Sequence, residues 1–255
     1  METLLVEKKD KVAKVTINRP EQRNALDYET HLKLISLFRG FEDDEEVDLV
    51  ILTGAGRAFC AGADVSIFKM ITDARRAMRR IDHVEELARA IEELSKPVIA
   101  RVNGPALGLG FLLVMASDFA IASEDSILGW PVISVGIAGG AARLAHILGE
   151  KKLKELILLG KVIGAKEAEA LGLVTRAVPP EELDAEVEKV ISELRKKSPI
   201  ALRLTKRAIN AAYRERESGG LLFDTAIQTI SLLTEDVREG VEAFLEKREP
   251  RWKGR

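Results

Sequence analysis

The chain has 255 residues, of which 46% are hydrophobic and 31% are charged, and its formal net charge is −2. These values are typical of an ordinary soluble globular protein with one large domain, or a domain with an appendage. The charge balance argues against a broadly basic surface for nucleic acid. No apolar run approaches the roughly 18 residues of a membrane-spanning helix, and the N-terminus has no apolar signal segment. We therefore expect a cytoplasmic protein with no membrane or nucleic-acid partner.

Cysteine and histidine usage narrows the chemistry. The single cysteine, Cys60, excludes an intramolecular disulfide and indicates a reducing compartment. Its apolar neighbours favour burial over use as a nucleophile. The histidines, His31, His83 and His146, are far apart in sequence and lack ligand-like neighbours. Each is expected to lie on the surface or on a helix face, and no metal site is expected.

The first half of the chain alternates predicted strands and helices. Residues 3–20 alternate in polarity around a charged turn and then run apolar, which predicts a hairpin. Asp27 is placed to cap the helix that follows, and 48–54 reads as a strand. A long amphipathic helix over about 73–95 precedes another strand at 98–102. This order is typical of parallel βα units.

The long helix contains a run of four arginines, Arg75, Arg76, Arg79 and Arg80, at helical spacing. Such a run can be a solvated helix face or a phosphate-binding patch. The solvated face is the better explanation in a chain whose overall charge is near zero. We therefore expect these side chains to face water.

The second half changes character near its end. A short apolar helix follows a glycine-rich turn, and 118–123 reads as a strand that begins with a structural, hydrogen-bonded acid, Asp118. Beyond Val178 no strand pattern remains, and successive helices are predicted at about 180–197, 199–217, 220–233 and 235–246. The prediction is thus an α/β core over 1–195 and a helical region over 196–255.

Two glycine-rich turns are the most informative feature of the chain. They are TGAGRAFCAGADV at 53–65 and NGPALGLGF at 103–111, and each follows an apolar strand and leads into a helical pattern. Neither has the spacing of a dinucleotide-binding fingerprint, and the chain contains no phosphate-binding loop and no G-x-S-x-G nucleophile motif. Their backbone N–H groups could instead converge to hold a negatively charged oxygen.

These motifs resemble those of the enoyl-CoA hydratase/isomerase family, the crotonase superfamily. The similarity is carried by LTGAGRAFCAGADV, KPVIARVNGPALGLGF and the tail EDVREGVEAFLEKREPRWKG, and it extends over nearly the whole chain. The resemblance implies a crotonase-like spiral of ββα turns and a C-terminal helical region that forms trimers, often as dimers of trimers. It also implies a lyase or isomerase that uses acyl-coenzyme A thioesters and needs no other cofactor.

By the same resemblance, the N–H groups of Ala63 and Leu109 form an oxyanion hole. Fixed donors of this kind stabilise the negative charge that a thioester oxygen gathers in an enolate. The family usually has glycine where this chain has Leu109, so we expect the leucine to reshape the hole. The alternative is that both turns only permit close packing of strand against helix.

Contacts with the coenzyme are also implied by the resemblance. Arg23 would approach the phosphates, and the backbone around Ala25, Ala61, Gly62 and Asp64 would line the adenine pocket. An ordinary solvated role for Arg23, and a turn-stabilising role for Asp64, are the alternatives.

Three further contacts are implied. Phe244 and Lys247 match tail residues that reach a coenzyme bound by an adjacent subunit, and Trp130 matches an aromatic residue near the aryl group in 4-chlorobenzoyl-CoA dehalogenases. The alternatives are a helix interface for Phe244 and solvation for Lys247.

The positions of the usual acid and base differ from the family. Hydratases of the family use two glutamates, and here Leu112 and Val132 occupy those positions. A positioned acid or base contributes about 10² to 10⁴ in rate, so efficient hydration is not expected. Other candidates are His83 and Glu85, for which surface charge on the helix is the better explanation. Three hypotheses stay open. They are an acyl-CoA enzyme with an unrecognised base, a conventional hydratase or isomerase, and a non-catalytic acyl-CoA-binding protein or scaffold from which the glutamates have been removed.

Overall fold

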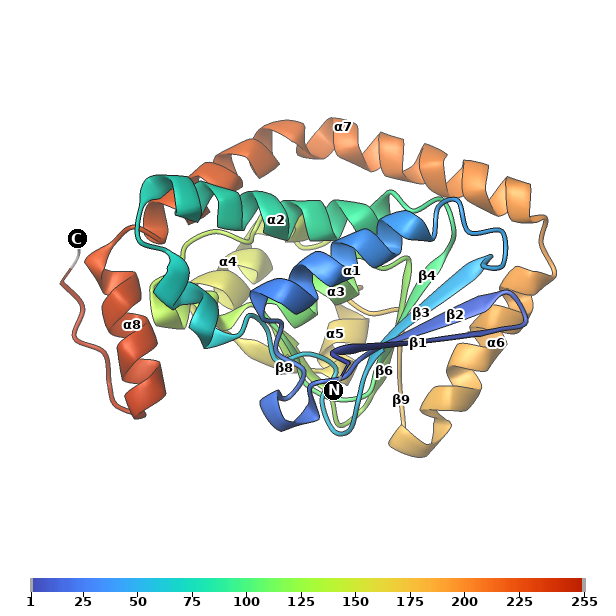
Figure 1. Cartoon of the computed structure of the whole chain (residues 1–255), viewed down its shortest axis with the longest axis horizontal. Coiled ribbons are helices and arrows are strands. Elements are labelled where there is room, and N and C mark those ends of the chain that lie inside the picture. The colour runs from blue at the N-terminus through green and yellow to red at the C-terminus, as the bar shows by residue number, and fades with distance from the viewer. Residues whose placement is uncertain (1, 254–255) are drawn as a thin grey trace.

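A computed structural model of the chain describes residues 2–253, and at 69–70 and 214–223 it describes the backbone alone. The last residue of the tail motif, Gly254, therefore lies outside the described residues. Two helices, α1 (Tyr28–Gly40) and α2 (Ala74–Glu92), lie over a twisted sheet, and α7 (Pro199–Ser231) runs alongside α2 (Figure 1). No described helix is both long and apolar enough to cross a bilayer.

The main sheet has six strands in the order β1-β2-β3-β4-β6-β9. Its strands are β1 (Leu4–Lys9), β2 (Val12–Ile17), β3 (Leu49–Gly54), β4 (Val98–Val102), β6 (Phe119–Ser123) and β9 (Arg176–Val178). The first two form the predicted antiparallel hairpin, whose turn residues Asp10 and Lys11 have φ of 50° and 63°. The remaining neighbours pair in parallel.

The parallel register decides where the two glycine-rich turns meet. Val50 of β3 pairs with Val98 of β4, so the two strands run together and end at the same edge of the sheet. Each turn leaves its strand at that edge. The sequence order of strand, turn and helix thus places both turns side by side.

A second, three-stranded sheet joins the two turns. It consists of β5 (Ala106–Leu107), β7 (Ile127–Gly129) and β8 (Val162–Gly164). Cys60 forms a bridge with Ala106, and the Leu107 N–H donates to the Cys60 carbonyl at 3.0 Å. The sequence did not predict these strands, because two or three residues are too few to show a strand period.

The remaining helices are α3 (Leu109–Ala116), α4 (Glu150–Leu158), α5 (Ala165–Ala170), α6 (Leu183–Arg195) and α8 (Glu235–Glu246). Of these, α3, α6 and α8 match predicted helices, whereas α4 and α5 were not predicted. The predicted cap at α1 is confirmed, since the Asp27 carboxylate accepts the Thr30 N–H at 2.8 Å. Asp73 caps α2 in the same way by accepting the Arg76 N–H at 2.9 Å.

The C-terminal region differs from the prediction in one respect. The two helices expected at 199–217 and 220–233 are a single 33-residue helix, α7, which continues through Gly219 and Gly220. An interior glycine costs a helix about 1 kcal/mol, and the packing of α7 along α2 offsets that cost. The predicted boundary at 195/196 falls in the short turn between α6 and α7. Oligomerisation through this region stays a prediction.

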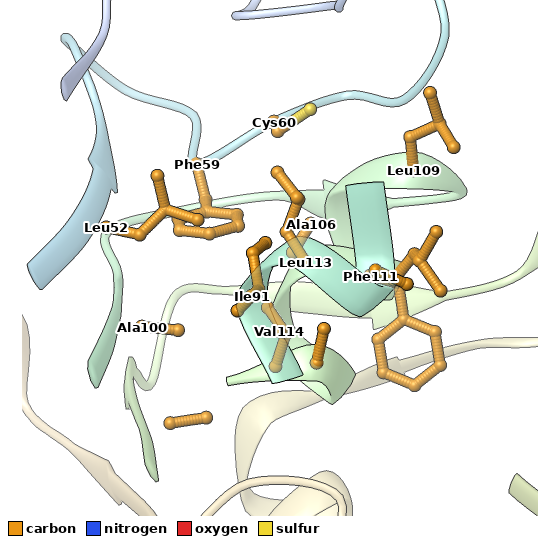
Figure 2. Packing of buried hydrophobic residues seen from close by; sticks show 14 of the residues in the cluster. Leu52, Phe59, Cys60, Ile91, Ala100, Ala106, Leu109, Phe111, Leu113 and Val114 are labelled. Carbon is orange, nitrogen blue, oxygen red and sulfur yellow. The ribbon is translucent and has the colours of Figure 1, made fainter. Parts of the chain in front are cut away.

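The core lies between the sheet and the helices that cover it. Figure 2 shows Leu52, Phe59, Ile91 and Leu113 packed together beside the second turn. Cys60 is fully buried in this cluster, and burial raises the pKa of its thiol to about 12. The expectation that Cys60 is an apolar core residue is confirmed.

Candidate functional site

The two predicted donors come together at a contact between two glycines. Gly62 and Gly108 precede Ala63 and Leu109, and their φ angles are +114° and +52°. A Cβ on Gly62 would lie 3.9 Å from the Leu109 nitrogen, and one on Gly108 would lie 3.8 Å from the Gly62 Cα. Both N–H groups therefore belong to one small region of the surface.

Neither donor is used by the protein itself. The Leu26 N–H donates to the Gly62 carbonyl at 2.8 Å and the Asp64 N–H to the Leu26 carbonyl at 2.9 Å, which leaves the Ala63 N–H between them unpaired. Leu109 is the first residue of α3, where a helix has no internal acceptor for its N–H. In the described part of the chain, no group accepts either N–H.

The leucine at the second donor fits without unusual backbone geometry. Leu109 has an ordinary helical conformation, and the positive φ falls on Gly108 before it. The side chain is buried, with 6% of its surface exposed. The N–H therefore keeps its place at the start of α3, where the helix dipole favours a negative ligand.

Ala63 and Leu109 line a cavity of about 300 Å³ between the two turns, α2, α7 and α8. Five of the predicted site residues other than the donors also line it, namely Ala61, Gly62, Trp130, Val132 and Phe244. Most of its wall is apolar, and the polar side chains on it are Arg80, Ser134 and Gln228. No aspartate or glutamate is among the lining residues that the structure describes.

Leu112 lies behind this cavity. It lines a separate space of about 20 Å³ together with Glu85, Met115 and Arg143, and Trp130 forms part of the wall of both spaces. Of the two residues assigned to the glutamate positions, Val132 therefore lines the main cavity, and Leu112 lines the smaller space next to it.

Glu85 is not the surface charge that its place on a helix suggested. Its side chain is 12% exposed and accepts a hydrogen bond from Arg143 Nη2 at 2.8 Å. Burial raises the pKa of the Glu85 carboxyl, and the Arg143 guanidinium opposes that rise. The ion pair holds this carboxylate beside Leu112, outside the main cavity.

The first turn also places the residues that the resemblance assigns to the coenzyme. Arg23 is exposed with φ +50°, and its carbonyl accepts the Ala61 N–H at 3.0 Å. The Ala25 carbonyl accepts from Arg19 Nη1. The segment of residues 23–25 is thus hydrogen-bonded to Ala61, a residue of the cavity wall, and we call this segment the rim.

Asp64 stabilises this turn. Its carboxylate accepts the Ser66 N–H at 3.0 Å and forms an ion pair with Arg19 at 3.1 Å. Although burial acts in the opposite direction, these bonds lower the pKa of Asp64. The geometry fits the turn-stabilising alternative for its side chain.

The tail residues lie at the open side of the molecule. Phe244 is 63% exposed and lines the mouth of the cavity within its own chain, and the exposed Lys247 ends α8 with φ +53°. Their predicted contact with a coenzyme in an adjacent subunit involves a second chain and stays a prediction.

Arg80 is the residue of this site whose exposure was predicted wrongly from the sequence. Arg75, Arg76 and Arg79 are exposed as predicted, but Arg80 is buried, with 6% of its surface exposed, and lines the cavity. The position of Arg80 in the helix does indicate that it is buried. It lies three residues after the buried Ala77 in α2 and therefore on the same helix face.

His31 holds the guanidinium of Arg80. Arg80 Nη1 donates to His31 Nδ1 at 3.3 Å, and His31 Nε2 lies 2.8 Å from the His83 carbonyl oxygen. A carbonyl only accepts, so Nε2 carries the proton and Nδ1 is free to accept. Burial, and then the nearby Arg80, lower the pKa of His31 to about 3. Burial lowers the pKa of Arg80 to about 10, so Arg80 remains a cation at neutral pH.

Other parts of the described surface offer less. A cleft of about 840 Å³ lies along α1 and α2 and is lined by charged side chains such as Glu42, Glu86 and Arg89. Of the candidate residues named from the sequence, Glu85 lines it, but neither of the two predicted donors does. The described residues include no group of three or more His, Cys, Asp or Glu side chains arranged to hold a metal ion.

Fold and site together define a class of protein, an α/β chain of crotonase type with a pocket at the junction of two glycine-rich turns. The family described as "Enoyl-CoA hydratase/isomerase" matches residues 7–255. The chain belongs to the enoyl-CoA hydratase/isomerase family.

Individual relatives agree with this assignment. The chain is 38% identical to a crotonyl-CoA hydratase of Syntrophomonas wolfei, over 97% of this chain and 96% of the relative. It is 38% identical to a short-chain-enoyl-CoA hydratase of Clostridium acetobutylicum, with the same coverage. A solved enoyl-CoA hydratase from Mycobacterium avium subsp. paratuberculosis superposes with a TM-score of 0.88 at 33% identity, covering 99% of both chains. The expected fold is confirmed.

Proposed function

We propose that the chain is an enzyme that binds acyl-coenzyme A thioesters and polarises the thioester carbonyl with the N–H groups of Ala63 and Leu109. The observation that carries this proposal is that two unpaired N–H groups open on one largely apolar cavity. Preorganised donors act on the charge that develops on the oxygen, and losing one typically costs about 10² to 10³ in rate.

The cavity suits the acyl group and the rim suits the coenzyme. Trp130, Val132 and Leu109 give the cavity an apolar wall, and its volume of about 300 Å³ limits it to a small group. The rim carries Arg23 beside the turn that the resemblance assigns to the coenzyme. The names of the relatives, crotonyl-CoA hydratase and short-chain-enoyl-CoA hydratase, favour short acyl chains.

The reaction is proposed to depart from ordinary hydration. We assign Leu112 and Val132 to the two glutamate positions, and no carboxylate is among the described residues that line the cavity. Proton transfer to or from the substrate then has no carboxylate partner among the described residues of the cavity wall.

Conventional hydration is the second candidate, and the names of the relatives favour it. It would require a carboxylate to reach the substrate from elsewhere. Glu85 is such a group only if it leaves Arg143 and passes Trp130.

The rate of crotonyl-CoA hydration distinguishes the two. We expect the unmodified chain to hydrate crotonyl-CoA at or near background, and Leu112→Glu with Val132→Glu to raise the rate. The matched control is Leu112→Gln with Val132→Gln, which adds similar bulk without an ionisable acid. Efficient hydration by the unmodified chain would overturn the proposed departure, although the acyl-CoA class would stand.

A panel of acyl-CoA thioesters, followed by mass spectrometry, tests whether the chain is an enzyme at all. A binding protein would leave every thioester unchanged, whereas an enzyme converts at least one of them.

A further inference from the structure

Among the buried cations that the structure describes, Arg80 has the fewest hydrogen-bond partners. Lys206 is paired with the Asp118 carboxylate at 2.6 Å, and Lys96 donates to the carbonyls of Phe41 and Asp44. Arg80 is buried to a similar degree, yet within the described residues its hydrogen-bond partner is the neutral His31, and no carboxylate lies within ion-pair distance. A buried charge without a counter-charge is costly.

The rest of the guanidinium is available to a ligand. Arginine has five N–H donors in a planar fork, and His31 takes one of them. Because His31 donates through its other nitrogen to the His83 carbonyl, it holds Arg80 in a fixed position. A carboxylate matches the fork with two parallel hydrogen bonds.

Among the described residues that line the cavity, none carries a negative charge. Arg80 lines the same space as Ala63 and Leu109, and the other polar side chains on that wall, Ser134 and Gln228, are neutral. Gln228 Nε2 is already bonded to the Asp224 carboxylate at 3.0 Å. A ligand that fills the cavity therefore meets an excess of positive charge at one place and two N–H donors at another.

We propose that Arg80 binds a carboxylate at the far end of the acyl group, so that the preferred substrates are coenzyme A thioesters of short dicarboxylic acids. This rests on the proposed function, which places the thioester carbonyl at Ala63 and Leu109. The acyl group then spans the cavity between the two N–H donors and the guanidinium. Its carboxylate supplies a counter-charge that none of the described residues places within ion-pair distance of Arg80.

Matched thioesters test the proposal. Glutaryl-CoA and pentanoyl-CoA have acyl chains of the same length and differ in ending with a carboxylate or a methyl group, and succinyl-CoA and butyryl-CoA form a shorter pair. Isothermal titration should show that the dicarboxylic member of at least one pair binds about tenfold more tightly, or better. In Arg80→Met, that ratio should fall to about one.

Two further variants show whether the charge of the Arg80 side chain, its forked shape or its position in the helix accounts for the preference. Arg80→Lys keeps a charge but loses the fork, so we expect an intermediate ratio. Arg79→Met removes the neighbouring exposed arginine and should keep the ratio of the unmodified chain.

Each outcome decides a different point. If none of the four thioesters binds, the proposed function fails and this inference fails with it. If both members of each pair bind equally, or if the preference persists in Arg80→Met, the role of Arg80 is overturned while the acyl-CoA function stands. Should Arg80→Met fail to fold, the ratios measured with the unmodified chain and with Arg80→Lys still decide.

Discussion

Arg80 Nη1 lies 3.3 Å from His31 Nδ1, and this hydrogen bond joins α2 to α1 beneath the cavity. His31 is fully buried and passes the connection on to the His83 carbonyl. The bond exists only while the imidazole is neutral, because a protonated histidine has no acceptor nitrogen. The position of Arg80 in the cavity wall therefore depends on the protonation state of His31, which does not line the cavity.

Protonation of His31 should destabilise the protein in mild acid. The folded-state pKa of about 3 lies below the ordinary value of 6.5, so the unfolded chain takes up a proton first as the pH falls. This contribution to stability is complete above about pH 6.5 and is lost as the pH falls from there toward 3. At pH 5 the loss amounts to about 2 kcal/mol, measurable by urea unfolding at pH 7 and pH 5.

His31→Gln is the variant that isolates this effect. The glutamine amide can donate to the His83 carbonyl and accept from Arg80 at any pH. The free energy of unfolding of this variant should therefore lack the loss of about 2 kcal/mol between pH 7 and pH 5 that His31 causes in the unmodified chain. His146→Gln serves as a control for the loss of a histidine elsewhere. An identical pH dependence in His31→Gln and the unmodified chain would contradict the assignment.

Gly108→Ala should weaken the polarisation of a bound thioester. The φ of +52° and ψ of −116° at this residue strain any side chain, although the nearest atoms to an added Cβ are 3.8 Å away. We expect a loss of stability of about 1 to 3 kcal/mol and a displaced Leu109 N–H. Isotope-edited infrared spectroscopy of [1-¹³C]butyryl-CoA should show a lowered carbonyl stretch with the unmodified chain and a smaller shift with the variant.

Gly149→Ala is the matched control for that experiment. Gly149 has φ −64°, and no atom lies within 4 Å of an added Cβ. It should keep both the stability and the infrared shift. Equal carbonyl shifts in Gly108→Ala and the unmodified chain would count against the Leu109 donor.

Much of the scaffold follows from local sequence. Asp27 caps a helix, a charged turn closes a hairpin, and two apolar strands in parallel register bring their glycine-rich turns to one edge of the sheet. These features depend on neighbours in sequence or on general rules of chain connection. They are the reason why the meeting of the two glycine-rich turns could be anticipated.

The polar side of the site could not be predicted in the same way. Arg80 stands in a run of arginines whose other members are exposed, and its burial depends on a histidine 49 residues away. Glu85 is held by Arg143, which lies 58 residues further along the chain. Contacts between distant segments determine which charged side chains are buried, and these contacts cannot be recognised in a single sequence.

Asp118→Asn should be strongly destabilising, because it removes the counter-charge of a buried lysine. The Asp118 carboxylate pairs with Lys206 at 2.6 Å and accepts the Val98 N–H at 2.7 Å, which fits its predicted structural role. Breaking one partner of a buried pair costs about 3 to 5 kcal/mol. Adding Lys206→Met to this variant should recover part of the loss in urea unfolding.

The exposed pair of Glu29 and Lys33, at 2.6 Å, provides the comparison. Glu29→Gln should leave the free energy of unfolding nearly unchanged, because surface ion pairs contribute little. Similar losses in Asp118→Asn and Glu29→Gln would show that the buried pair does not anchor α7 to the core.

Trp130 should report directly on occupation of the cavity. The chain has two tryptophans; Trp130 is 8% exposed and lines the cavity, whereas Trp252 is 49% exposed near the C-terminus. In Trp252→Phe, emission therefore comes from Trp130 alone. Butyryl-CoA should change that emission saturably when excited at 295 nm, whereas free coenzyme A, which has no acyl group to enter the cavity, should change it less. If titration calorimetry detects butyryl-CoA binding to Trp252→Phe while its emission stays constant, the acyl group binds somewhere other than beside Trp130.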